Sequence, residues 1–132
     1  MFIANFDKQK QAMFLNLAYT MIYADGKLDE KEQMLFNSYQ IEVNVDMSDV
    51  HKVDFEEGLA IFDECSIEEK QRIFFELYAI ALIDDVYADE EKVLVDIVKN
   101  RFNISDDKMN QMKNALLSFI NAYNNLQSVV TK

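Results

Sequence analysis

Three carboxylates in one short turn are the residues of this chain best suited to bind a metal ion. These are Asp25, Asp29 and Glu32 of the turn Ala-Asp-Gly-Lys-Leu-Asp-Glu-Lys-Glu, which also contains Glu30. Carboxylate oxygens are the ligands preferred by hard divalent cations such as Ca²⁺, Mg²⁺ and Mn²⁺. The spacing therefore predicts an oxygen-rich site for one of these ions.

The order of residues in this turn matches the last two thirds of an EF-hand loop. In that register the first two ligand positions fall on Met21 and Tyr23. Neither side chain can supply a carboxylate, so the sequence excludes a true EF-hand.

A second acidic turn follows later in the chain, with five carboxylates in eight residues and no Gly or His among them. These carboxylates are Asp84, Asp85, Asp89, Glu90 and Glu91. Like charges packed this closely repel one another, and a divalent ion between the two turns would relieve the repulsion. A competing interpretation needs no metal, because acids in the first turn of a helix gain about 0.3–1 kcal/mol each from the helix dipole.

Amphipathic helices must position these turns. The apolar spacing from Phe14 to Ile22 predicts a helix over residues 7–23, and Gly26 supplies the turn. Asp29 and Glu32 then have the spacing of a capping box before a second helix. The apolar side predicted for this second helix consists of Met34, Leu35, Ser38 and Tyr39.

Later capping residues predict further helices. Ser48 and Asp54 would cap two short helices, Ser66 with Glu69 forms another capping box, and Ser105 would cap the last helix. A helix with Val93, Leu94, Ile97 and Val98 is expected after the second acidic turn. The last helix has a long apolar stripe, which we expect to contribute to the core: Met109, Met112, Leu116, Phe119, Ile120, Tyr123 and Val130.

An approximate internal repeat relates the two acidic turns. An offset of 59 in the numbering places Tyr19 on Tyr78, and it aligns the first and last carboxylates of the turns. An offset of 60 aligns Asp29 with Asp89 but pairs Glu32 with Lys92. We favour 59, in which each half is an apolar helix, an acidic turn and a second helix.

Length and composition indicate an all-α fold. The chain has 132 residues, two Gly and no Pro, too few turn residues for many short strands. We expect one domain over residues 1–132, a compact bundle of about six to seven helices. The longest clean apolar run has seven residues, whereas a membrane-spanning helix needs about 20. A cytoplasmic protein without membrane insertion is therefore expected.

The net charge of −11 opposes binding to phosphate backbones, so no DNA or RNA partner is expected. Cys65 and His51 are each the only residue of their type, which excludes an internal disulfide and the usual zinc sites. Acids beside Cys65 disfavour its thiolate, so the sequence predicts no catalytic nucleophile there.

The helix that ends in Ala-Asp-Gly, with Leu28 two residues on and Glu32 seven after Asp25, resembles the TerB-like family of tellurite-resistance-associated domains. The resemblance extends from about Phe14 to Met112. It implies an all-helical fold with two related halves and a divalent metal held by acidic residues. Transferred by motif, the implied ligands are Asp25, Asp29, Glu32, Asp84 and Glu91. Asp85 departs from the family, which usually has Gly at that position.

Two functions of different classes follow. The first is a non-enzymatic module that binds Ca²⁺, Mn²⁺ or Mg²⁺ and acts through protein partners, with a stress or tellurite-resistance role implied by the resemblance. The second is a metal-independent adaptor, whose acidic segment 42–69 binds a basic partner; this segment has ten acids and one Lys. A carboxylate-based hydrolase is a third, less favoured hypothesis, because sequence alone indicates no substrate cleft.

Overall fold

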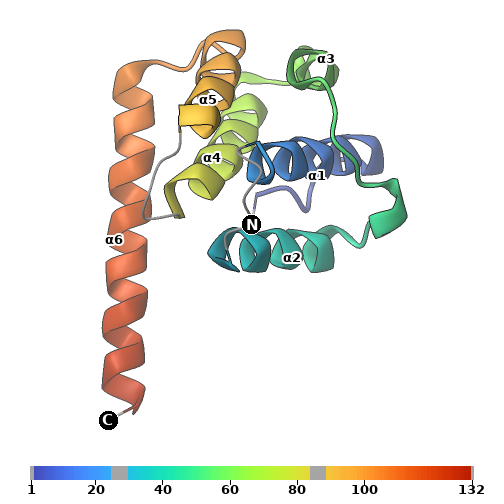
Figure 1. Ribbon diagram of the computed structural model, residues 1–132. Coiled ribbons are helices and arrows are strands. Elements are labelled where there is room, and N and C mark those ends of the chain that lie inside the picture. The colour runs from blue at the N-terminus through green and yellow to red at the C-terminus, as the bar shows by residue number, and fades with distance from the viewer. Residues whose placement is uncertain (1, 25–29, 84–88, 132) are drawn as a thin grey trace.

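The computed structural model describes residues 2–24, 30–83 and 89–131, and within these ranges it has six α-helices and two short 3-10 helices (Figure 1). The α-helices are α1 (Lys8–Ile22), α2 (Glu30–Val43), α3 (Phe55–Leu59), α4 (Ile67–Ile83), α5 (Asp89–Arg101) and α6 (Asp106–Thr131). The 3-10 helices are η1 (Met47–Asp49) and η2 (Ala60–Phe62). The all-α prediction is confirmed.

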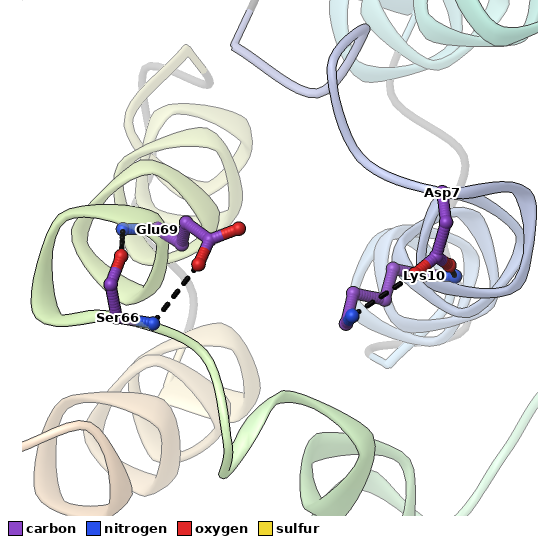
Figure 2. A network of polar contacts seen from close by, with 4 residues as sticks. All are labelled: Asp7, Lys10, Ser66 and Glu69. Carbon is purple, nitrogen blue, oxygen red and sulfur yellow. Dashed lines mark hydrogen bonds and ion pairs between the residues drawn. The ribbon is translucent and has the colours of Figure 1, made fainter.

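Two polar networks fix the beginnings of α1 and α4 (Figure 2). The Asp7 carboxylate accepts a hydrogen bond from the Lys10 backbone N–H at 2.9 Å and forms an ion pair with Lys10 Nζ at 3.0 Å. At α4 the Ser66 N–H donates to Glu69 Oε1 at 3.0 Å, while Ser66 Oγ accepts from the Glu69 N–H at 3.1 Å. The predicted capping box at Ser66 is confirmed.

The other predicted caps have mixed outcomes. Asp54 caps α3 and Ser105 caps α6, each by accepting a backbone N–H at 3.0 Å. The prediction that Ser48 caps a helix over the next residues is wrong, because Ser48 lies inside η1 and its N–H donates to Asp46 Oδ1 at 3.0 Å. An aspartate two residues earlier competes successfully for the capping role. The predicted box of Asp29 and Glu32 lies outside the described side chains.

Helix α1 lies at the centre of the bundle, in contact with α2, α3, α4 and α5. Its fully or nearly fully buried apolar residues are Phe14, Leu15, Leu17, Ala18, Met21 and Ile22. Two side chains of α1 hold the segment between η1 and α3 by hydrogen bonds. Asn16 Oδ1 accepts from the His51 N–H, and Thr20 Oγ1 accepts from the Val53 N–H, both at 3.0 Å. Gly58 of α3 allows a close approach, since a Cβ there would lie 3.0 Å from the buried Leu17 side chain.

The starts of α1 and α4 agree with the repeat at an offset of 59. Lys8 begins α1 and Ile67 begins α4, so Tyr19 and Tyr78 hold the same position in these two helices. The turns themselves, residues 25–29 and 84–88, lie outside the described residues.

The buried sides of α2 and α5 agree only in part with the predicted ones. Tyr39 and Val98 are buried and Leu35, Leu94 and Ile97 pack against the core, whereas Met34 is 66% exposed and Val93 is 59% exposed. The buried stripes also contain residues that were not predicted: Phe36 and Val43 in α2, Glu91 and Val95 in α5, and Phe102 directly after it. Apolar residues occur on several sides of both helices, so sequence periodicity alone could not select the side that packs.

Helix α6 packs against α4, and its C-terminal half extends beyond the other helices (Figure 1). Lys99 Nζ forms an ion pair with Asp106 at 2.9 Å, which links the end of α5 to the first turn of α6. No residue of α6 is buried, and Phe119 is 58% exposed. Met109 and Met112 contribute to the core as expected, whereas Phe119, Tyr123 and Val130 are exposed because the helix extends beyond the bundle. Within the described ranges, none of the helices has the length and apolar character needed to cross a membrane.

Candidate metal centre

The structure describes part of the predicted ligand set. Asp25, Asp29 and Asp84 lie outside the described residues, and the side chain of Glu32 does as well. Glu91 is described, and its side chain is completely buried in the first turn of α5. Among the described residues alone, no group of three His, Cys, Asp or Glu could hold a metal ion.

Glu91 begins the buried stripe that continues through Val95 and Val98. The repeat places Glu32 at the matching position of α2, four residues before the buried Phe36. In both halves a glutamate thus precedes an apolar stripe in the same register.

Burial distinguishes Glu91 from its neighbours. Asp89 and Glu90 share the first turn of α5 with it but are exposed. The helix dipole stabilises an exposed carboxylate at this end of a helix, so it explains Asp89 and Glu90 without any metal. A buried carboxylate loses its hydration and needs compensation from positive charge or hydrogen bonds. Burial thus sets Glu91 apart from the two other acids of this helical turn.

The ends of the two acidic turns lie close together. A cavity of about 390 Å³ is lined by Tyr23 and Ala24, which follow α1, and by Glu90 at the start of α5. Ala24 immediately precedes Asp25 in the sequence, and Glu90 immediately precedes Glu91. The first turn therefore starts next to the place where the second turn ends.

Two further side chains border this region. Lys52 also lines the cavity and is exposed. The Tyr23 hydroxyl donates to Gln33 Oε1 at 3.3 Å, which connects the end of α1 to the first turn of α2. This hydrogen bond joins Tyr23, which precedes the first acidic turn, to Gln33, which follows it.

A second buried acid was missed by the sequence analysis. Glu76 is 2% exposed and lines an apolar cavity of about 390 Å³ between α2, α4 and α6, where Tyr39 is its hydrogen-bond partner. Burial raises the pKa of Glu76 above its ordinary value, and burial together with Glu76 raises the pKa of Tyr39. The available signal was spacing: Glu76 lies three residues after Ile73 and four before Ile80, on the apolar side of α4.

Glu76 leads to a pH-dependent prediction. Because its pKa is raised in the folded state, the folded chain binds this proton more tightly than the unfolded chain. The associated stability is complete at low pH and is lost as pH rises from about 4.5 through the folded pKa. We expect Glu76→Gln, which resembles the protonated form, to gain stability relative to the parent between pH 4 and pH 7.

Urea unfolding of both proteins at the two pH values measures this gain. Glu64→Gln, at an exposed acid outside the cavity, serves as the control and should show the same difference from the parent at both pH values. An identical difference at pH 4 and pH 7 for Glu76→Gln would contradict the prediction.

The single cysteine and histidine agree with their predicted minor roles. Burial raises the pKa of the half-buried Cys65 thiol, which disfavours the reactive thiolate. His51 is exposed, and its ring Nδ1 lies 3.2 Å from the Asp49 carbonyl oxygen.

The described residues form an all-α protein in which α1 contacts α2 and α4 contacts α5. No family model matches the chain, and no curated protein or solved structure was found to be similar to it. The resemblance to TerB-like domains thus rests on the sequence motifs alone.

Proposed function

We propose that this protein is a non-enzymatic helical module that binds a divalent cation between its two acidic turns. The observation behind the proposal is the complete burial of Glu91, beside exposed acids of the same helical turn. A cation close to this carboxylate would offset the free energy lost with its hydration. The proposed ligands remain Asp25, Asp29, Glu32, Asp84 and Glu91.

The cavity between α1 and α5 supports the same proposal. Ala24 and Glu90 line it from the two halves, and they directly precede the proposed ligands Asp25 and Glu91 in the sequence. An ion bound there would link the halves and reduce repulsion in a chain of net charge −11. Hard oxygen ligands favour Ca²⁺, Mn²⁺ or Mg²⁺ over softer metals.

The resemblance of the acidic turns to TerB-like domains extends the proposal to a biological role. Such a module would act through protein partners in a stress or tellurite-resistance response. A thermal-shift screen with Ca²⁺, Mg²⁺, Mn²⁺ and Zn²⁺ tests the ion. Stabilisation by one of the hard cations supports the proposal, and no shift with any of the four ions rejects it.

A metal-independent adaptor is the second candidate, and the exposed acids of the middle segment favour it. These acids project from η1, α3 and their flanking residues: Asp46, Asp49, Asp54, Glu56, Glu57 and Glu64. A surface of one charge sign steers a partner of the opposite sign. Asp63 is not freely available to such a partner, because it forms a two-point ion pair with Arg101 at 2.7 and 2.9 Å.

The adaptor predicts binding to a basic peptide that weakens as salt rises and does not change on addition of a chelator. Replacing Glu56 and Glu57 by Gln should weaken this binding severalfold. Binding that is the same in the parent and in this variant would reject the middle segment as the docking surface.

A further inference from the structure

The projecting half of α6 is an apolar surface that the bundle leaves uncovered. Four side chains at alternating spacings of four and three residues, Phe119, Tyr123, Leu126 and Val130, are between 56% and 69% exposed. Met109, Met112 and Leu116 continue the same 3-4 spacing toward the bundle, where they are partly buried. We call the four exposed residues the α6 seam.

This spacing is the heptad pattern of helices that pair side by side. Apolar residues at alternating intervals of three and four line one stripe of a helix, which a second helix with the same stripe can cover. The pattern runs from Met109 to Val130, three full heptads. Its first part is used within the chain, where Met109 and Met112 pack against the core.

The projecting half also needs packing in order to be stable as a helix. It is rich in Asn, Ser, Val and Thr, which have lower helix propensity than Ala or Leu. Helices in proteins derive most of their stability from packing of an apolar face rather than from propensity. A covered α6 seam would supply that packing.

The absence of charged side chains in the projecting half of α6 favours a second copy of this chain as its partner. The segment from Asn114 to Thr131 contains no charged side chain, although the whole chain has a net charge of −11. Two copies can therefore bring these segments together without like-charge contacts, which the acidic bundle would impose elsewhere. An interfacial membrane helix usually has Lys and Arg on its polar side, and this segment has none.

We infer that a second copy of this chain covers the α6 seam, as an antiparallel helix pair. The antiparallel arrangement places the two acidic bundles at opposite ends of the pair, since each bundle lies beside the N-terminal half of its own α6 (Figure 1). In the register that uses only exposed seam residues, Tyr123 meets Leu126 of the other copy and Phe119 meets Val130.

The same register covers a groove in the bundle. Phe119 lines the apolar cavity of about 390 Å³ to which Leu35, Phe75 and Ala79 also contribute. The end of the partner's α6, near Val130, would lie over the mouth of this cavity. The seam and the groove then form one continuous apolar interface.

Sedimentation of the full chain at about 0.1 mM tests the inference, because at that concentration even an association with a Kd near 10 µM is largely complete. We expect a dimer for the parent and a monomer for Leu126→Asp. Ser128→Asp adds the same charge to the opposite side of α6 and should remain dimeric. A monomeric parent would overturn the inference, whether or not it binds lipid vesicles. Equal effects of the two variants would overturn it as well.

Disulfide formation tests the orientation in a Cys65→Ser background. In the antiparallel register the two copies of Val130 are about 16 Å apart along the helix axis, which is beyond the reach of a disulfide. Phe119→Cys and Val130→Cys proteins should cross-link when mixed, and neither should do so alone. Efficient cross-linking of Val130→Cys alone would indicate parallel helices and overturn the antiparallel pair.

Discussion

Ca²⁺ or Mn²⁺ at 100 times its dissociation constant should raise the free energy of unfolding by about 2.7 kcal/mol. The proposed ligands come from segments about 60 residues apart in the sequence, so the proposed ion would bind the folded chain and not the unfolded one. The gain should continue to rise with the logarithm of ion concentration. Calorimetric titration and melting curves at several ion concentrations measure it.

Substitutions in the two halves should remove this response. Asp25→Asn deletes one ligand charge while keeping the size of the side chain, so the ion response should fall. Without ion, this variant should be slightly more stable than the parent, because one repelling carboxylate is gone. Glu91→Gln should likewise weaken ion binding, through the buried member of the ligand set.

Asp96→Asn is the matched control, since Asp96 is an exposed acid of α5 beyond its first turn. Its ion response should equal that of the parent. If the carboxylates serve only as helix caps, the parent shows no heat and no change in melting temperature at millimolar ion. In that case Asp25→Asn would show at most a small loss of stability.

Phe62→Ala should destabilise the protein by about 3–5 kcal/mol and lower its melting temperature by roughly 10 °C or more. Phe62 is completely buried in η2, the segment between the two helix pairs. Its ring makes edge-to-face contacts with Phe6, at 6.5 Å between centroids, and with Phe102, at 6.4 Å. Truncation leaves a cavity where the N-terminal segment, η2 and the end of α5 meet.

Phe2→Ala is the control for the loss of a phenyl ring. Phe2 is 43% exposed and contacts the Phe75 ring at 5.7 Å, so its truncation should cost less than about 1 kcal/mol. Equal losses in the two variants, measured by urea unfolding, would show that Phe62 does not anchor the core as described.

The fold class and several helix boundaries could be predicted from the sequence. Two Gly and no Pro in 132 residues favoured helices, and the spacing of Ser66 to Glu69 predicted a capping box because such contacts are local in sequence. The offset of 59 could likewise be found by comparing the chain with itself, and the starts of α1 and α4 agree with it.

Which sides of the helices are buried depends on tertiary packing and could not be predicted from the sequence. Helices α2 and α5 have apolar residues on several sides, so their buried stripes depend on where α1 and α4 pack rather than on periodicity. The exposure of the α6 seam follows for a similar reason, because the length of the bundle sets how much of the helix is covered. Burial of Glu91 and Glu76 was also undetermined by sequence, since the free energy of a buried carboxylate depends on partners distant in the chain.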